Sequence, residues 1–247
     1  MKIICLNTWG NNVCIDDLAA FFNAHKDVDI FCLQEIIKGG KDKSFIMDGE
    51  EVAVKGYELF DRISESLPEH TGFFRPHFMN YFGLAIFVKK GIEVLDEGER
   101  LVHKGLVPEV AGTHARNIQY VKVVNNGRAL RVINFHGLWN GQGKADSEDR
   151  IKQSAKILGF TSKIEGDYVL CGDFNLLPDT QSIKVIEDSG LRNLITEYGV
   201  TSTRTSLYKK SIKFADYAFV TEGIEVKDFK VLPHEVSDHA PLYLEIR

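Results

Sequence analysis

The sequence predicts an α+β fold in which two mostly antiparallel sheets pack against each other, with helices on the outside. Short apolar runs recur along the whole chain with turn signals between them, a pattern typical of strands. Asn126-Gly127 stands between two of these runs and is a strong signal for a tight hairpin. Only a few helical patterns separate the runs, so a regular alternation of parallel strands and helices is not expected.

Three buried strands and one amphipathic helix are expected in the first 90 residues. The strands cover Lys2–Asn7, Asp29–Glu35 and Tyr81–Lys90, and the helix covers Ile15–His25. In the helix, Leu18, Phe21 and Phe22 share one face, as a 3.6-residue period requires. The segments Lys38–Tyr57 and Ser64–Asn80 show no clear period, and the sequence predicts long loops there.

The second half of the chain holds the hairpin, two helices and further strands. The hairpin lies within residues 117–137, later strands cover residues 167–175, 214–220, 224–232 and 242–246, and helices cover residues 145–160 and 182–190. Ser147 is placed to cap the first helix, and Gly190 to stop the second. Pro241 favours a strand start immediately after it. No linker, repeat or low-complexity run divides the chain, so residues 1–247 are expected to form a single domain.

Composition narrows the functional class. No apolar run approaches the length of a membrane span, and the first residues do not resemble a signal peptide, so a cytoplasmic, non-membrane protein is expected. Cys5, Cys32 and Cys171 lie inside apolar runs and are expected to be buried, reduced thiols. The net charge of −5 argues mildly against tight, non-specific DNA binding, although it leaves room for a local basic pocket. No obvious apolar surface helix is present, which predicts a monomer.

Polar residues follow or precede many of the predicted strands. These residues are Asn7, Glu35, His136, Asp173, Asn175, Asp216, Asp238 and His239. Any one of them is more simply explained as a turn residue, because Asp and Asn are favoured in turns. Together they supply the oxygen ligands that a hard divalent cation prefers and the histidines that proton transfer requires. The sequence therefore predicts groups suited to a metal-dependent site at the strand boundaries.

The same residues carry a resemblance to a known family. The motifs LNTW, LQE, NFHG, GDFN, FADY and SDH occur in this order over the whole chain. This series resembles the endonuclease/exonuclease/phosphatase family, of the exonuclease III and DNase I type. GDFN with a later SDH is the most specific pair. The resemblance implies a four-layer αββα sandwich, made of two mostly antiparallel or mixed sheets flanked by helices, with the site at one end of both sheets.

The resemblance also implies a metal site. Glu35 of LQE is expected to hold Mg²⁺, with Mn²⁺ as a substitute, and Asn7 of LNTW to lie beside it. Asp238 of SDH is expected to belong to the same site, directly or through water. Many family members carry Asp or Gly two positions after the asparagine, whereas this chain has Trp9, which favours a one-metal site.

The catalytic roles follow in the same way. Asp173 of GDFN is expected to activate or orient the attacking water, and Asn175 to fix that water or a phosphoryl oxygen. His239 is expected to contact the phosphate or the nucleophile, oriented by Asp216 of FADY. His136 of NFHG is expected to donate to the phosphoryl oxygens. Apurinic endonucleases have tyrosine where this chain has His136, so that branch is disfavoured.

Substrate contacts are less specific. Arg116 is a candidate phosphate clamp, since its planar guanidinium matches phosphate oxygens, and a solvated edge arginine is an equal alternative. Trp139 is a candidate for base stacking, against the alternative of a loop tryptophan packed on the domain. The leading hypothesis is a Mg²⁺-dependent phosphodiesterase acting on a nucleic-acid or nucleotide-type diester by attack of an activated water. The alternatives are a phosphomonoesterase or lipid phosphodiesterase on the same scaffold, and a non-catalytic binding module.

Overall fold

The computed structural model describes residues 1–247 except 11, 13, 40, 42, 48–49, 54, 57 and 106–113. The helices are α1 (Ile15–Ala24), α2 (Leu59–Ser66), α3 (Glu148–Thr161), α4 (Gln181–Glu187) and α5 (Leu194–Glu197). The strands of the first large sheet are β1 (Lys2–Asn7), β2 (Ile30–Ile37), β5 (His70–Phe78), β6 (Phe82–Lys89), β13 (Val226–Val231) and β14 (Leu242–Ile246). Those of the second are β7 (Val94–His103), β8 (Arg116–Asn125), β9 (Arg128–His136), β10 (Asp167–Asp173), β11 (Arg192–Asn193) and β12 (Asp216–Val220).

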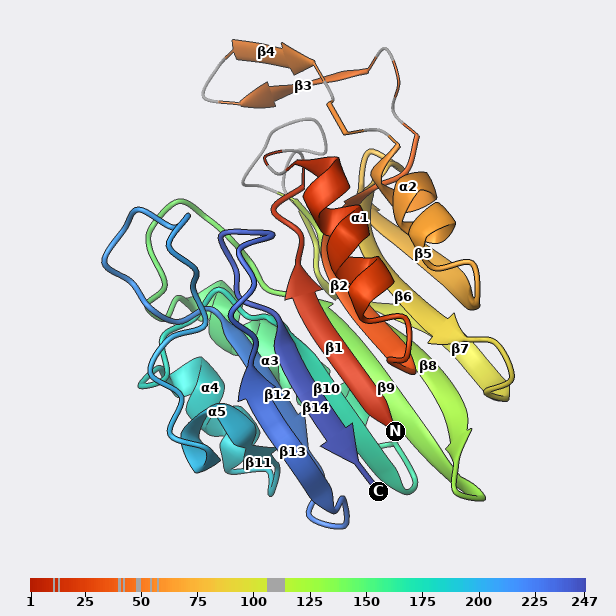
Figure 1. Ribbon diagram of the computed structural model, residues 1–247. Coiled ribbons are helices and arrows are strands. Elements are labelled where there is room, and N and C mark those ends of the chain that lie inside the picture. The colour runs from red at the N-terminus through yellow and green to blue at the C-terminus, as the bar shows by residue number, and fades with distance from the viewer. Residues whose placement is uncertain are drawn as a thin grey trace.

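Both large sheets have six strands and are mixed, with antiparallel pairs in the majority (Figure 1). The first has the order β13-β14-β1-β2-β6-β5 and the second the order β11-β12-β10-β9-β8-β7. Each contains one parallel pair near its centre, β1 with β2 and β9 with β10. The carboxyl ends of the two strands in a parallel pair lie at the same edge of a sheet, so the residues that follow them meet there.

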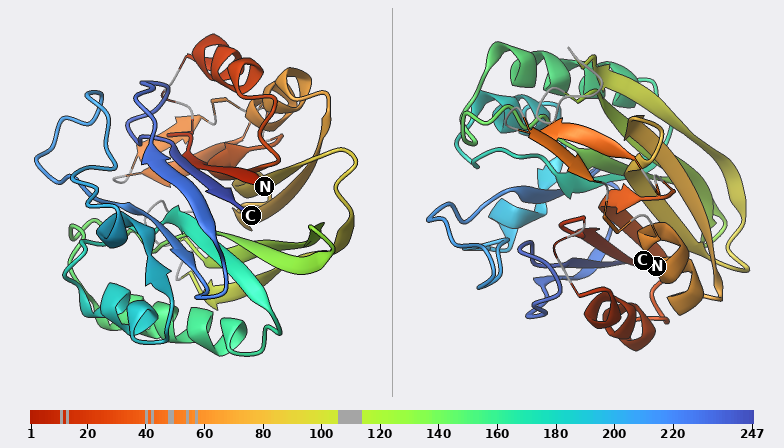
Figure 2. Two further views of the ribbon diagram at one scale, coloured as in Figure 1. Left: turned by 60° about the horizontal axis from the view of Figure 1, so that its bottom comes forward. Right: turned by 90° about the horizontal axis from the view of Figure 1, so that it is seen from above.

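Helices cover the outer face of each sheet, and the two inner faces pack together (Figure 2). Alternate residues of β1 show these layers: Ile4 and Leu6 belong to an apolar cluster with Phe21 and Phe22 of α1. Ile3 and Cys5, on the opposite face of the same strand, belong to the cluster between the sheets, which also includes residues of α3 and α4. This period of two is what a strand buried on both faces requires. The predicted four-layer sandwich is confirmed.

A polar cross-link joins the two sheets just below the strand ends. Gln34 of β2 donates from Nε2 to Asn134 Oδ1 of β9 at 2.6 Å. Asn134 in turn donates from Nδ2 to the carbonyl oxygens of Leu33 and Ala85, at 2.9 and 3.1 Å. Both amide side chains are fully buried, where an unpaired polar group is costly. The pairing therefore favours a single register between the sheets. Gln34 directly precedes Glu35, and Asn134 lies two residues before His136.

The two predicted loop segments are wrong. The first contains β3 (Ser44–Met47) paired with β4 (Glu50–Ala53), and the second contains the end of α2 and the whole of β5. β5 is an edge strand that carries Pro76, a residue tolerated at sheet edges but not in their middle. Most of its residues are half-buried, so the strand shows no alternation of apolar and polar positions. β7, also at an edge and rich in charged residues, was missed for a similar reason.

The chain ends meet beside the first sheet. The amino group of Met1 donates to the carbonyl oxygen of Ile246 at 2.6 Å, and Figure 1 shows the two termini close together. Over the residues that the structure describes, no helix is long and apolar enough to cross a membrane. Cys5, Cys32 and Cys171 are buried and unpaired, as expected.

Candidate active site

The strand ends gather the predicted residues from both sheets. Asn7 ends β1 and Glu35 lies near the end of β2, while His136 and Asp173 end β9 and β10. In the register of the parallel pair, Asp173 stands directly beside His136, and in the antiparallel pair it stands beside Asp216, the first residue of β12.

A β-bulge places Glu35. Leu33 pairs with Ala85 and Ile36 pairs with Gly83, so two residues of β2 face the single residue Leu84 on β6. Glu35 takes the left-handed conformation, with φ of 58°, which a side chain adopts only at a cost. A bulge of this kind turns a side chain away from the regular pleat. Here it brings the Glu35 carboxylate to Asn7.

Asn7 connects the carboxylates of the two sheets. Its Nδ2 donates to Glu35 Oε1 at 3.1 Å and to Asp173 Oδ2 at 3.0 Å. Its Oδ1 accepts from the backbone N–H of Trp9 at 2.9 Å, which fixes the orientation of the amide. Both amide protons are therefore committed to carboxylates, and a carboxylate could not replace this donor.

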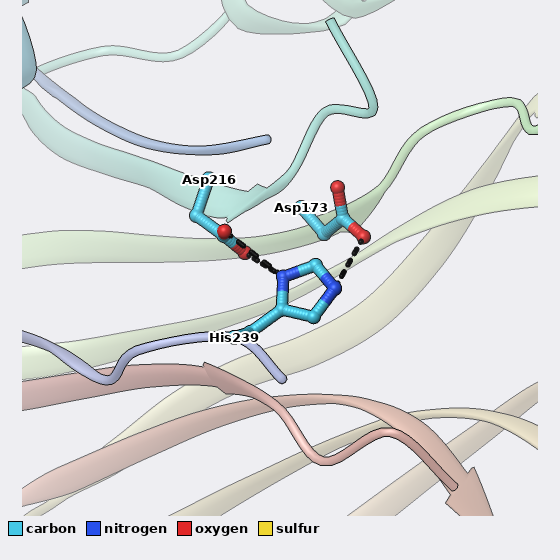
Figure 3. A group of neighbouring side chains, drawn as sticks. All are labelled: Asp173, Asp216 and His239. Atoms are coloured by element: carbon cyan, nitrogen blue, oxygen red, sulfur yellow. Dashed lines mark hydrogen bonds and ion pairs between the residues drawn. The ribbon is translucent and has the colours of Figure 1, made fainter. Parts of the chain in front are cut away.

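His239 lies between two aspartates (Figure 3). Its Nδ1 is 2.8 and 2.9 Å from the two carboxylate oxygens of Asp216, and its Nε2 is 3.6 Å from Asp173 Oδ2. Thr203 Oγ1 donates to Asp216 Oδ2 at 2.9 Å and holds that carboxylate in place. Burial alone would lower the pKa of His239, but the charges of Asp216 and Asp173 outweigh it and raise the pKa. The pair favours a protonated imidazole with a fixed ring orientation.

Asp173 is an ionised carboxylate in the centre of the site. Burial by itself would raise the pKa of Asp173, but the positive charges of His239, Lys144 and Arg204 lower it below its usual range. Asp173 Oδ1 also accepts from the backbone N–H of Asn175 at 2.8 Å. A carboxylate held ionised in this way is suited to orient a water molecule or accept its proton.

The GDFN turn depends on close backbone approaches. Asn175 has φ of 55°, and its Nδ2 lies 3.4 Å from the carbonyl oxygen of Gly137. A Cβ atom on Gly172 would lie 1.9 Å from the carbonyl oxygen of Phe135, and one on Gly137 would lie 2.2 Å from that of Phe174. Glycine at position 172 lets the ends of β9 and β10 approach closely, and glycine at position 137 lets the loops that follow them pack directly on each other.

His136 is a neutral histidine. Its Nε2 is 3.7 Å from Asp173 Oδ2 and 3.9 Å from Glu35 Oε1. Burial, and then the positive charge of Arg116, lowers the pKa of His136 well below its usual value. A neutral imidazole with its proton on Nε2 could donate one hydrogen bond to a group bound in the site, so the role expected of His136 stays a prediction.

Arg116 is buried beside His136, so the alternative of a solvated edge arginine is wrong. Only 3% of its surface is exposed. Its Nε donates to the carbonyl oxygen of Gly137 at 2.9 Å, and its Nη1 donates to His77 Nε2 at 3.0 Å. Burial lowers the pKa of Arg116 to about 10, and the charges of Glu35 and Asp173 oppose that change. The residue remains a cation at neutral pH, close to both carboxylates.

Trp139 is half-buried in the loop after β9, and its ring lies under the ammonium group of Lys210, 5.9 Å from the ring centroid. Its described contacts do not connect it to the carboxylates, so its role in substrate binding stays a prediction.

The sequence reasoning missed two cations near the site. Arg204 Nη1 forms an ion pair with Asp238 Oδ2 at 2.9 Å, and both side chains are buried. Lys144 is buried near Asp173 and is considered further below. Both residues lie in loops without periodicity, where no local pattern marks a buried face.

The acidic residues suit a divalent cation on the Glu35 side of the site. The ligand atoms of Asp173, Asp216 and His239 lie within 4.8 Å of one another, but the Asp216 and His239 atoms are committed to their mutual hydrogen bonds. Burial, together with neighbouring carboxylates, raises the pKa of Glu35, and the opposing effects of Asn7 and His239 compensate only in part. Burial likewise raises the pKa of Asp238, which His239 and Arg204 compensate only in part. Asp238 Oδ1 is also buried with no hydrogen-bond partner in the described structure. Glu35 and Asp238, whose negative charges are only partly compensated, therefore suit a hard cation better than the hydrogen-bonded pair of Asp216 and His239.

Sequence comparison identifies the family. The chain matches the model of the Endonuclease/Exonuclease/phosphatase family over residues 4–239 and belongs to this family. The protein is therefore a phosphoesterase, an enzyme of the metal-dependent phosphoric ester hydrolase class. A comparison with curated protein sequences finds no match.

Solved structures share the fold over the whole chain. A family protein from Leptotrichia buccalis has a TM-score of 0.74 at 20% identity, covering 100% of this chain and 99% of its own. The mannosyl-6-phosphatase Bt3783 of Bacteroides thetaiotaomicron has a TM-score of 0.74 at 17% identity, covering 100% and 99%. D. rerio TDP2 in complex with a single-strand DNA product has a TM-score of 0.72 at 15% identity, covering 100% and 98%.

Proposed function

We propose that the protein is a Mg²⁺-dependent phosphodiesterase that hydrolyses a nucleic-acid or nucleotide-type diester by attack of an activated water. The observation that carries this proposal is Asn7, which ties the carboxylates Glu35 and Asp173 together across the two sheets. One of these carboxylates is undercompensated and suits a cation, whereas the other is ionised and suits a water. A single site thus offers both groups that hydrolysis of a phosphate ester needs.

Glu35 would hold Mg²⁺, with Asn7 beside it and Asp238 contributing directly or through water. When bound, the ion would neutralise charge on the phosphoryl oxygens and on the leaving group. Mn²⁺ is expected to substitute, because it accepts the same oxygen ligands.

The protein's own groups would perform the proton and orientation steps. Asp173 would orient the water and accept its proton, with Asn175 fixing the water or a phosphoryl oxygen. His239, protonated and oriented by Asp216, would donate to the phosphate, and His136 would donate one hydrogen bond from Nε2. Arg116 would bind a further phosphoryl oxygen.

A phosphomonoesterase is the second candidate, because the same groups would act on a terminal phosphate. Among proteins of this fold, Bt3783 is a phosphatase and D. rerio TDP2 was captured with a DNA product, so the fold leaves the choice open. The expected cytoplasmic location, single domain and monomeric state stay predictions.

The first experiment measures initial hydrolysis rates of bis-p-nitrophenyl phosphate and p-nitrophenyl phosphate, with Mg²⁺, Mn²⁺ or EDTA. Asp173→Asn is measured in parallel, with Asp179→Asn, on the exposed side of the same loop, as the matched control. Faster cleavage of the diester that requires metal and Asp173 supports the proposal. Preference for the monoester replaces it with the phosphatase. Metal binding without turnover of these or natural phosphate esters would favour the non-catalytic module.

A further inference from the structure

Lys144 is a buried lysine with no acceptor for its ammonium group. The residue is 3% exposed, and Nζ has no hydrogen-bond partner among the residues that the structure describes. An unpaired charge in this position is costly, and lysines are rarely buried unless they are paired. A chain that keeps a lysine here either bears that cost without benefit or reserves the ammonium group for a ligand.

The backbone around Lys144 is held rigidly. The buried guanidinium of Arg150 donates from Nη2 to the carbonyl oxygen of Gly143 at 2.8 Å and from Nη1 to that of Ala145. The carbonyl oxygen of Lys144 itself accepts from the backbone N–H of Leu177 at 2.9 Å. Three consecutive carbonyl groups are thus fixed, two of them by one side chain from α3. Such a fixed backbone is expected of a residue whose side chain must be held in place to bind a ligand.

The surroundings of Lys144 are those of the active site. Leu177, to which it is bonded, follows closely after Asp173 and Asn175 in the loop that ends β10. Burial lowers the pKa of Lys144, while Asp173, Asp216 and Asp238 oppose this change, so all three carboxylates lie within range of its charge. None of them forms an ion pair with Nζ within 4.0 Å in the described structure. The ammonium group therefore lies near the acidic cluster without being neutralised by a direct contact.

Lys144 and Arg116 interact by charge with different sets of carboxylates in the site. Arg116 interacts by charge with Glu35 and Asp173, whereas Lys144 interacts with Asp173, Asp216 and Asp238. Asp173 is common to both. A phosphate group bound next to Asp173 would therefore lie within range of the charges of both cations.

We propose that Lys144 is a substrate-binding residue whose ammonium group contacts a non-bridging oxygen of the substrate phosphate. The inference rests on the proposed function, because it assigns a ligand to that same site. Lysine acts on phosphate as a point charge, so the contact needs no bidentate geometry. Among the residues that the structure describes, the ammonium group has no hydrogen-bond partner, and in the complex the phosphate would supply one.

The test compares Lys144→Met and Lys144→Arg with the wild-type enzyme, using Lys152→Met as the matched control. Lys152 lies in α3, is 60% exposed at its side chain and pairs with Glu148, so its loss is expected to change little. The first readout is kcat/KM on the best phosphate ester found for the wild type. The second is the rise in Tm that inorganic phosphate produces in the presence of Mg²⁺.

Lys144→Met is expected to lower kcat/KM by about 10- to 100-fold, the size of one charged hydrogen bond. Its Tm without phosphate is expected to equal or exceed that of the wild type, since an unpaired buried charge is removed, and the phosphate-induced rise in Tm is expected to be lost. Lys144→Arg should retain part of both properties.

A purely structural lysine gives the opposite result. A Lys144→Met protein that unfolds or loses Tm, with an undiminished response to phosphate, overturns the inference, as does kcat/KM within twofold of the wild type. If the wild type hydrolyses no phosphate ester, the proposed function fails. The phosphate-induced rise in Tm, compared between wild type and Lys144→Met, then still decides the role of Lys144.

Discussion

Replacing Asp216 with asparagine removes the charge beside His239 with little change of shape. In the wild type, both carboxylate oxygens lie within 2.9 Å of His239 Nδ1, and one of them also accepts from Thr203. In Asp216→Asn the amide oxygen can still accept from Nδ1, although the Thr203 hydroxyl loses its acceptor. The shape is unchanged, so the fold is expected to survive while the charge beside His239 is removed.

The magnitude follows from the burial of both partners. Asp216 is 2% exposed and His239 is 4% exposed, so solvent screens their interaction little. Hydrogen bonds to charged groups contribute about 1.5–3 kcal/mol, which corresponds to a loss of about 10- to 150-fold in kcat/KM. The Asp216 charge is also the main cause that raises the pKa of His239. In the variant that pKa falls, so activity that needs protonated His239 is lost at a lower pH as pH rises.

The assay is kcat/KM as a function of pH for wild type and Asp216→Asn at saturating Mg²⁺. Asp228→Asn serves as the control, because Asp228 pairs with Lys230 on the surface, where such pairs contribute little. We expect the control to match the wild type and Asp216→Asn to show both the lower rate and the displaced alkaline limb. A variant with wild-type kcat/KM and an unchanged profile would refute the role assigned to the His239–Asp216 pair.

Three further predictions concern stability. Asn7→Asp removes two hydrogen bonds to carboxylates and adds a third negative charge, so in EDTA the free energy of unfolding should fall by about 3 kcal/mol or more. Urea titration should show that Mg²⁺ restores part of the lost stability. An equal loss of stability in EDTA and in Mg²⁺ would contradict this prediction. Gly172→Ala should lower the free energy of unfolding by more than about 2 kcal/mol, because its Cβ would clash with a backbone oxygen. Gly159→Ala, in α3 with open space around it, should raise that free energy by about 0.5–1 kcal/mol. Thermal unfolding measures both, and similar values for the two variants would refute the argument. Burial lowers the pKa of His114 to about 3, so below about pH 6.5 the unfolded chain binds a proton that the folded chain excludes. The stability of the folded protein therefore decreases as the pH is lowered below that value. His239, with its raised pKa, acts in the opposite direction, so the test is His114→Gln, whose urea midpoint should fall less between pH 7.5 and 5.5 than that of the wild type.

The acidic and histidine residues of the candidate site could be proposed from the sequence because strand ends can be located from local patterns and the motifs there resemble those of a known family. Asn7 and Asp173 each terminate an apolar run, and parallel pairing then brings such termini to one edge of a sheet. What the local pattern could not give is the left-handed bulge at Glu35. That conformation depends on the pairing of β2 with β6, a strand about fifty residues away.

The cations were harder to predict for a physical reason. Arg204 and Lys144 lie in loops where no period marks a buried face, and charged residues in such loops are most often solvated. Their burial depends on tertiary contacts: Arg204 on Asp238, and the loop of Lys144 on the guanidinium of Arg150. The edge strands β5 and β7 escaped prediction similarly, since half-buried and charged positions obscure their alternation.

The direction of each pKa shift separates the carboxylates of the site into two kinds. The pKa of Asp173 is lowered because the cations around it outweigh burial, whereas the pKa values of Glu35 and Asp238 are raised because burial prevails. A divalent cation near the latter two would compensate them, and would lower their pKa values in turn. Its charge would then add to those of Lys144 and the other cations in attracting a phosphate. Because linkage is reciprocal, Mg²⁺ should tighten the binding of inorganic phosphate by the same factor that phosphate tightens the binding of Mg²⁺. Calorimetric titration of each ligand with and without the other measures both factors. Independent binding would show that the cation does not lie close enough to the phosphate to serve the reaction.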